Sequence, residues 1–459
     1  MNFTDQISEF TVGVPFEQIP MEVVRVAKEF VLDSVGVQLI GSREPVSKIV
    51  REYIKEDGGI PEAGVIGGGF RTSVTHAAFL NGTSNHAPEL EACGNFAGSN
   101  PLSVIPVALV LGEKLKVSGK RVLEAIIIGF EIQGKMGIAT TPGSHDKGWC
   151  AIAVQGTMGA AVTAAKILNL SVDQTKMSLG IAASQAGGLM RQFGSMTHLL
   201  EGGFACRNGV TAAILAQKGL TADKRILDGP SNMWEVMINE QGYNPEKMIR
   251  GLGDPFYFKS PGTSMKKYPC CFFTHRAIEA LLQLVCEHGL SYEDVERVKA
   301  GVTPFIKEAL VGGADPRSGD MARFSLEHCL ASVLLDKDVT VDSFTNEKVL
   351  SHPLREARRK IDLEIHPEWP SGRSALVIPI TIKLKNGKEL THKVDKLKGT
   401  MDLPLNRKEQ EGRYRSFAQP YLSDSQIEES MECILSLEGV NDITNLMTAV
   451  TFGRKGSSA

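Results

Sequence analysis

The sequence predicts a mainly helical protein with a smaller α+β part. Segments with apolar residues at helical spacing fill most of the first 260 residues, and helical spacing returns from about Asn406. Between them lies the clearest strand signal, two alternating runs that flank Asn386-Gly387. A chain of 459 residues exceeds the size of one hydrophobic core, so two domains are expected. We expect a large all-helical domain built from residues 1–262 and 400–459, with a smaller α+β lid domain of residues 263–399 inserted between them.

The helices of the first part have recognisable starts and ends. Pro20 suits the start of a helix that continues through MEVVRVAKEFVLDSVGVQLIG to Gly41, and VSKIVREYIKEDGG is a shorter amphipathic helix stopped by glycines. LSVIPVALVLGEKL and RVLEAIIIGFEIQGKMGIA are apolar on nearly all sides, so both should be central helices. AIAVQGTMGAAVTAAKILNL is rich in small residues that permit close helix packing, and Ser171 begins the helix after it.

The second part mixes strands and helices. VERVKAGVT alternates as a strand does, and ARFSLEHCLASVLLDK returns to helical spacing. EKVLSHPLREARRKI should be a helix that breaks near Pro353. ALVIPITIKLKNGKELTHKVD predicts a hairpin with a type I′ turn at Asn386-Gly387. Ser423 and Gln426 fit a capping box in a late helix, and the tail GRKGSSA is expected to fray.

Composition excludes several classes of protein. The net charge of −3 offers no basic face for nucleic acid and no polybasic patch for a membrane. No apolar run reaches the length of a membrane span, and the N-terminus does not read as a secretory signal. The eight cysteines are scattered without a CxxC pair, so we expect free thiols in a reducing compartment, the cytoplasm.

Standard catalytic motifs are absent from the sequence, and no Cys/His set has zinc-ligand spacing, so no metal site is expected. Four polar segments near glycines are the candidates for an active site instead. The first is interpreted as a loop with two carboxylates, a His and a Cys between two apolar helices. Each segment has a structural alternative, because a single His, a buried Cys or a surface Glu is commonly structural. The segments are Asn81–Pro106, Ser144–Cys150, Gly188–Gly209 and Ser264–Ala277.

Seven segments in this order resemble the MmgE/PrpD family, which includes 2-methylcitrate dehydratase, cis-aconitate decarboxylase and iminodisuccinate epimerase. They are AKEFVLDSVGVQLIG, HAAFLNGTSNHAPELE, IPVALVLGE, GIAASQAGGLMRQFGSMTH, ACRNGVTAAILAQKGLTADKRILDGP, KKYPCC with its following TH, and ARFSLEHCLASVLL. The resemblance covers most of the chain. It implies a helical domain and a lid domain with the active site between them, a homodimer, no cofactor and no metal. It also implies proton abstraction next to a carboxylate of a small di- or tricarboxylic acid.

The chain departs from the family pattern at the residues that would react. Glu89 and Glu91 stand where aspartates are common, and Asn100 replaces a His. Cys150 also stands at a common His position, and His198 lies where a lysine is common. Lys266 keeps the family's lysine, whereas Cys271 replaces the His of decarboxylase-like members. We therefore expect the catalytic residues to be His198, Lys266, Cys271, Glu89 and Cys150, and the substrate-binding residues to be Arg191, Lys267, Asn100, Glu91, Cys93 and Tyr268.

The resulting prediction is a cofactor-independent dehydratase that acts on a small carboxylic acid. A second reading is an isomerase or epimerase in which two thiols, Cys150 and Cys271, serve as paired acid and base. A decarboxylase is the third reading. The fourth is a family member that has lost its chemistry and acts as a binding or structural dimer.

Overall fold

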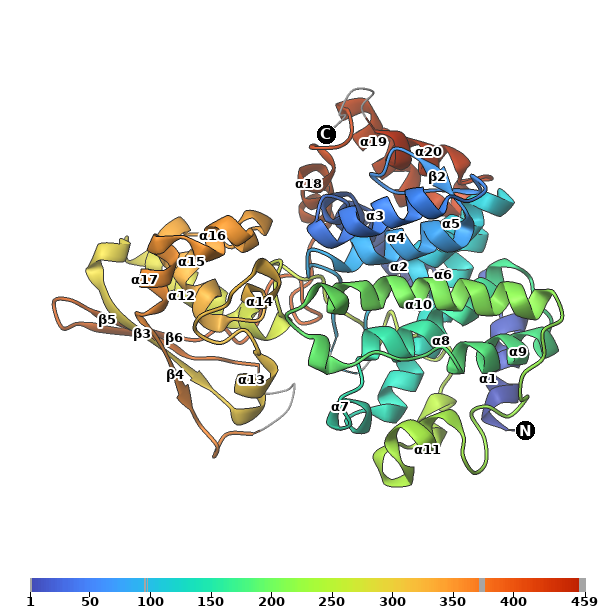
Figure 1. Cartoon of the computed structure of the whole chain (residues 1–459), viewed down its shortest axis with the longest axis horizontal. Coiled ribbons are helices and arrows are strands. Elements are labelled where there is room, and N and C mark those ends of the chain that lie inside the picture. The colour runs from blue at the N-terminus through green and yellow to red at the C-terminus, as the bar shows by residue number, and fades with distance from the viewer. Residues whose placement is uncertain (1, 95, 97, 371–375, 454–459) are drawn as a thin grey trace. The chain divides into compact units, whose positions relative to one another are not determined.

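The computed structural model describes residues 2–94, 96, 98–370 and 376–453, and within them the protein is mainly helical with two small sheets (Figure 1). The predicted mainly helical class with an α+β part is confirmed. Contacts group the chain into two compact units, one of residues 1–191, 198–265 and 406–459, and one of residues 192–197 and 266–405. In the described part of the chain, no helix combines the length and apolar character that crossing a membrane requires.

The first unit is built from helices and one two-stranded sheet, β1 (Ala63–Gly64) and β2 (Arg71–Thr72). Most of its helices come from the N-terminal part of the chain, and three further helices come from the C-terminal end. The helices are α1 (Phe3–Gly13), α2 (Met21–Gly41), α3 (Pro45–Asp57), α4 (Val74–His86), α5 (Val104–Leu115), α6 (Gly119–Thr140), α7 (Gly143–Asp146), α8 (Ala151–Ile167), α9 (Val172–Ala183), α10 (Met196–Gln217), α11 (Met233–Ile238), α18 (Arg407–Ala418), α19 (Asp424–Leu435) and α20 (Thr444–Phe452).

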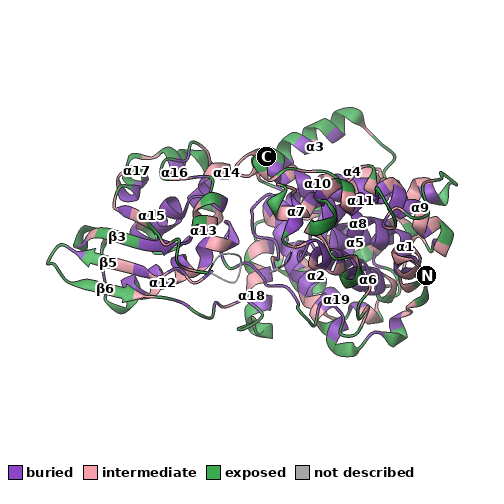
Figure 2. Ribbon diagram, turned by 90° about the horizontal axis from the view of Figure 1, so that it is seen from below, coloured by how far each residue is buried: buried purple, intermediate pink, exposed green. Residues whose placement is uncertain are grey.

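The core of this unit lies around α5, α6 and α8. Every residue of α5 from Val104 to Glu113 is buried, and most of α6 is buried as well, as Figure 2 shows. These are the two helices whose all-round apolar character predicted a central place, and α6 packs along α8 through small residues. Gly129 allows that approach, because a Cβ atom there would lie 1.9 Å from the Thr163 hydroxyl.

Helix ends follow the predicted signals. Pro20 precedes α2, and Gly58, at a φ of 80°, ends α3. Ser171 with Gln174 and Ser423 with Gln426 form capping boxes that satisfy backbone N–H groups at the starts of α9 and α19.

The second unit contains a four-stranded sheet with the strand order β4-β3-β5-β6. Strand β3 pairs in parallel with β4 and antiparallel with β5, and helices α12 and α15 pack against the sheet. The alternating segment VERVKAGVT forms β3, as predicted. The elements are α12 (His275–Glu287), β3 (Val295–Val302), α13 (Pro304–Ala309), α14 (Gly319–Ala322), α15 (Leu326–Asp336), α16 (Asn346–Leu350), α17 (His352–Arg358), β4 (Ile361–Ile365), β5 (Ile380–Leu384) and β6 (Glu389–His392).

The hairpin is where predicted, but its predicted turn type is wrong. Strands β5 and β6 pair antiparallel around Asn386-Gly387. A type I′ turn needs positive φ at both central residues, whereas only Gly387, at 83°, has it. The backbone N–H of Gly387 donates to the Leu384 carbonyl at 2.9 Å, which closes a three-residue loop with glycine in the left-handed position.

Pro353 has the predicted effect on its segment. Helix α16 ends at Leu350, and α17 begins at His352 with Pro353 in its first turn, where the missing N–H costs no hydrogen bond. The tail beyond Gly453 that we expected to fray lies outside the described residues.

Candidate active site

The segment Asn81–Pro106 is less of a loop than its composition indicated. Residues 81–86 form the end of α4, so the connection to α5 begins only at Ala87. The Asn81 side chain is used inside the fold: its Oδ1 accepts from the Ile66 N–H at 2.9 Å, and its Nδ2 donates to the Gly64 carbonyl at 3.1 Å. A polar side chain such as Asn81 can therefore be buried in a helix, because hydrogen bonds to the backbone of another segment satisfy it.

Only the first part of the segment Gly188–Gly209 is a break between helices, because α10 begins at Met196. Gly202 and Gly209 lie inside this helix, whereas Gly188 and Gly194 precede it. A Cβ atom on Gly82 of α4 would lie 2.5 Å from the Cys206 sulfur, and one on Gly202 of α10 would lie 3.2 Å from the His86 Cβ. The glycines thus let α4 and α10 pack closely, and this contact places His86 against His198.

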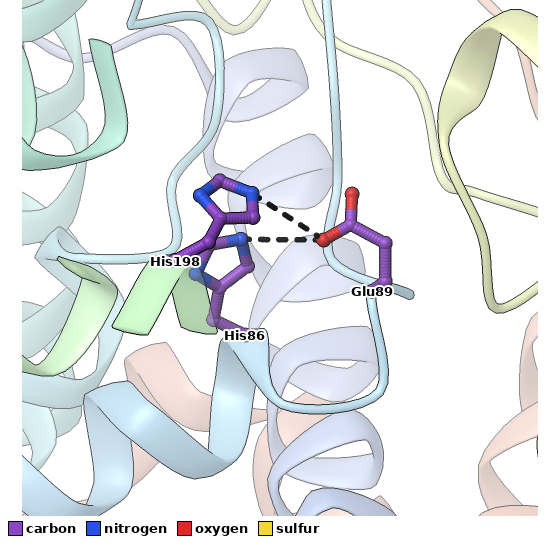
Figure 3. Close-up of side chains that lie close together, drawn as sticks. All are labelled: His86, Glu89 and His198. Atoms are coloured by element: carbon purple, nitrogen blue, oxygen red, sulfur yellow. Dashed lines mark ion pairs between the residues drawn. The ribbon is translucent and has the colours of Figure 1, made fainter. Parts of the chain in front are cut away.

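Three buried titratable side chains meet at that contact, as Figure 3 shows: His86, Glu89 and His198. Oε2 of Glu89 lies 3.5 Å from Nε2 of His86 and 3.7 Å from Nε2 of His198. The two imidazole rings meet edge to face with centroids 4.6 Å apart. Glu89 adopts a φ of 53°, a left-handed conformation that costs a non-glycine residue about 1 kcal/mol. Such strain is typical of functional sites.

Glu201 supports His198 from the other side of the ring. It follows His198 by one helical turn, and its Oε2 lies 2.9 Å from the His198 Nδ1. The second oxygen of Glu201 accepts from the Leu189 N–H at 2.9 Å. That part of the backbone is held to the segment before α8, since the Cys150 N–H donates to the Gly188 carbonyl at 2.9 Å. The Glu201 carboxylate, held by the Leu189 N–H, therefore fixes the orientation of the His198 ring.

Cys150 lies at the start of α8 beside this pair. Burial raises the pKa of its thiol well above the usual value, and the neighbouring Glu201 carboxylate raises this pKa further. The group is therefore a thiol near neutral pH. This state disfavours the thiolate base of the paired-thiol reading, and it makes the thiol a weak acid.

Four other residues predicted for the site also belong to the first unit. The amide of Gln133 donates to the Asn100 carbonyl at 2.6 Å, which fastens the connection to α6. Cys93 forms an antiparallel bridge with Ser264 through both backbone hydrogen bonds, at 2.8 and 3.0 Å. Glu91 is buried, and Arg191 is exposed in a short 3₁₀ turn.

Four predicted site residues belong to the second unit. Lys267 forms an ion pair with Glu279 at 2.7 Å, and the Tyr268 hydroxyl donates to the same carboxylate at 2.6 Å. Both side chains therefore bind the Glu279 carboxylate within the second unit. Lys266 is fully buried, and Cys271 is buried with its N–H donating to the Arg323 carbonyl at 2.9 Å.

Sequence reasoning did not assign His86 or Glu201 to the site. A signal for Glu201 was present, because His198 and Glu201 are three residues apart and share one face of a helix. The contact between His86 and His198 had no such signal, since it depends on how α4 and α10 cross. One ligand atom each from His86, Glu89 and His198 lie within 4.8 Å of one another, a set that spacing along the chain does not reveal.

Chemically, this cluster can hold and move a proton. Two imidazoles flank one carboxylate, and a second carboxylate fixes the tautomer of His198. Groups of this kind serve as general acids and bases near neutral pH.

Two family models match the chain. The one described as MmgE/PrpD N-terminal domain matches residues 5–246, and the one described as MmgE/PrpD C-terminal domain matches residues 268–438. Together they cover more than half of the 459 residues.

Curated relatives match over nearly their whole length. Cis-aconitate decarboxylase of Homo sapiens is 28% identical over 457 residues, which is 97% of this chain and 94% of the relative. The protein of the same name from Mus musculus is 28% identical, covering 96% of this chain and 92% of the relative. The one from Aspergillus terreus is 27% identical, covering 97% and 95%.

Proposed function

Because the chain belongs to the MmgE/PrpD family, we propose that it is a lyase that acts on a small di- or tricarboxylic acid by proton transfer next to a carboxylate. The observation that carries this proposal is the placement of His198 between Glu201 at its Nδ1 and Glu89 at its Nε2. Glu201 keeps a proton on Nδ1, so Nε2 is the atom that gives or takes a proton. His86 also faces the Glu89 carboxylate, so the proton has a second carrier.

Loss of CO₂ is the outcome that the relatives favour, since they are named cis-aconitate decarboxylases and match nearly end to end. In such a step the bond to one substrate carboxylate breaks, CO₂ leaves, and its electron pair stays on the carbon skeleton. A neighbouring substrate carboxylate stabilises that charge. The His198 Nε2–H then protonates the carbon, and a proton from solvent restores the imidazole through Glu89 or His86.

Loss of water is the second candidate, and the placement of the Cys150 thiol next to His198 and Glu201 supports it. Dehydration needs one group to remove a proton and another to protonate the departing hydroxyl. Cys150 remains a protonated thiol because burial raises its pKa, and it lies beside Glu201, the carboxylate that holds the His198 ring. His198 as base would remove the proton, and Cys150 as acid would protonate the departing hydroxyl.

Substrate carboxylates need cations to hold them. Lys267 is engaged by Glu279 within the second unit, so among the predicted cations we propose the buried Lys266 and the exposed Arg191 to bind substrate carboxylates in addition to their contacts in the fold. The second unit is proposed to act as a lid, the assembly to be a homodimer, and the reaction to need no cofactor.

The test is to incubate the full-length protein with a panel of di- and tricarboxylic acids in D₂O and to follow products by NMR and CO₂ by trapping. Release of CO₂ with one deuterium in the product supports the decarboxylase, whereas an alkene formed with loss of hydroxyl supports the dehydratase. Deuterium entry with inversion and no net loss of substrate would support an isomerase instead.

His198→Gln should lower turnover about 100- to 10,000-fold, the usual worth of a general acid or base. The matched control is His76→Gln, because His76 pairs with Asp57 at 3.1 Å on α3 and α4 away from the cluster. Turnover that survives His198→Gln would overturn the assignment of His198. The absence of turnover and exchange over the whole panel would favour a non-catalytic family member.

A further inference from the structure

The cluster His86, Glu89 and His198 has a second chemical capacity. Two imidazole nitrogens and one carboxylate oxygen point at a common space, and all three residues are buried. Two His and one carboxylate are a common ligand set for divalent transition metals. The three ligands come from the end of α4, the turn after it and the first turn of α10.

The separations between these atoms suit a metal ion better than direct hydrogen bonds. A charge-assisted N–H···O bond is about 2.7–2.9 Å long, whereas Glu89 Oε2 lies 3.5 and 3.7 Å from the two Nε2 atoms. Ligands bound to zinc at about 2.0–2.2 Å in a tetrahedron lie roughly 3.3–3.6 Å from one another. The observed distances are close to the edges of such a tetrahedron.

The surroundings of His198 also match those of a metal ligand. A ligating His commonly gives its other ring N–H to a carboxylate, which fixes the tautomer and the ring orientation. His198 has this arrangement, because Nδ1 lies 2.9 Å from Glu201 Oε2 while Nε2 faces the cluster. Glu201 could itself be counted with Cys150 and His198 as a ligand group, but its oxygens already accept from His198 and Leu189. Glu201 is therefore the supporting group.

We infer that His86, Glu89 and His198 form a binding site for a divalent transition-metal ion of the zinc class, held by both Nε2 atoms and one Glu89 oxygen. The binding site goes beyond the proposed lyase and does not depend on it, whereas the inhibitory role described next rests on that proposed function. The ion takes the Nε2 lone pair through which His198 would exchange a proton. Occupancy of the site and proton transfer at that atom therefore exclude each other, and the bound metal acts as an inhibitor.

The test is metal binding by the full-length protein after treatment with a chelator. Zn²⁺ binding is measured by calorimetry and elemental analysis, and Co²⁺ serves as a spectroscopic probe. We expect one ion per chain and a strong visible Co²⁺ absorption of the kind given by four-coordinate sites. His86→Ala, Glu89→Gln and His198→Gln should each weaken Zn²⁺ binding at least 100-fold, and Glu201→Gln should weaken it about 10- to 100-fold.

His76→Gln is the matched control and should leave Zn²⁺ affinity unchanged, and thermal unfolding of each variant separates lost binding from lost folding. Unchanged affinity in a folded Glu89→Gln protein would overturn the site, as would a Co²⁺ spectrum of the hexa-aquo type. Binding is read without substrate, so a failure of the lyase proposal leaves this result standing. If the lyase is active, added Zn²⁺ should inhibit it and the chelator should restore it; activation by Zn²⁺ would overturn the inhibitory role.

Discussion

The Nδ1 atom of His198 lies 2.9 Å from the Oε2 atom of Glu201, one turn further along the same helix. The carboxylate is held in turn by the Leu189 N–H at 2.9 Å. The ring of His198 is therefore oriented by the backbone of another segment, and its Nε2 is presented to Glu89.

Glu201→Gln tests this relationship. The amide keeps the shape of the side chain but removes the charge that favours a proton on Nδ1, so turnover should fall about 10- to 100-fold, less than in His198→Gln. Steady-state kinetics on the substrate found by the panel measure this, and the KM should change little. Glu438→Gln, which removes an ion pair with Lys28 at 2.7 Å, is the control. Equal kinetics in the two variants would show that Glu201 does not position His198.

The crossing of α4 and α10 should tolerate no added methyl group. A Cβ on Gly202 would lie 2.5 Å from Leu102 and 3.2 Å from the His86 Cβ, so Gly202→Ala should lower the free energy of unfolding by about 1–3 kcal/mol and disturb the site. Gly412 is the matched control, since it lies inside α18 and a Cβ there meets nothing within 4 Å. Gly412→Ala should stabilise the protein by about 0.5–1 kcal/mol. Urea denaturation compares the two, and a harmless Gly202→Ala would refute the close crossing.

The thiol of Cys150 should resist alkylation in the native protein. Burial hides its sulfur and raises its pKa well above the usual value, so little thiolate is present at pH 7.5. Cys286 is exposed and serves as the internal control. Brief treatment with iodoacetamide followed by peptide mass spectrometry should show Cys286 labelled and Cys150 protected, and both labelled in urea. Rapid native labelling of Cys150 would revive the reading in which it is a thiolate base.

His328 should make stability depend on pH. Its Nε2–H donates to the Ser343 carbonyl at 2.8 Å, and its Nδ1 accepts from Arg358 at 3.2 Å, so the buried ring is neutral. Burial lowers the pKa of His328 from 6.5 to about 4. Between these values the unfolded chain binds more protons than the folded one, so stability is full above pH 6.5 and falls toward pH 4 by up to about 1.4 kcal/mol per unit.

His328→Gln should flatten this part of the stability profile, whereas His352→Gln, at an exposed residue, should leave the slope as it is. Denaturation of the three proteins from pH 4 to 7 gives the comparison. A slope that persists in His328→Gln would assign the dependence to other groups.

Much of the fold could be predicted from the sequence because its signals are local. Helix starts are marked by residues that act on the backbone close to them in sequence, as at Pro20, Ser171 and Ser423. Pro353 also acts locally, because it is tolerated only in the first turn of a helix, and its segment divides there. The turn type at Asn386-Gly387 could not be predicted, since the number of residues in the loop follows from the register of β5 and β6. For the candidate site, the sequence singled out His198, Glu89 and Cys150, which the structure brings close to Glu201 or His86, two residues to which the sequence assigned no role.

The sequence by itself determined the family, the helical class and the segments that carry reactive groups. Only the tertiary structure decided which of these groups meet. His86 and His198 are more than a hundred residues apart in sequence, and they touch because glycines let α4 and α10 approach until the rings lie 4.6 Å apart. Local patterns report neighbours along the chain, whereas a site of this kind depends on the packing of surfaces that are distant in sequence.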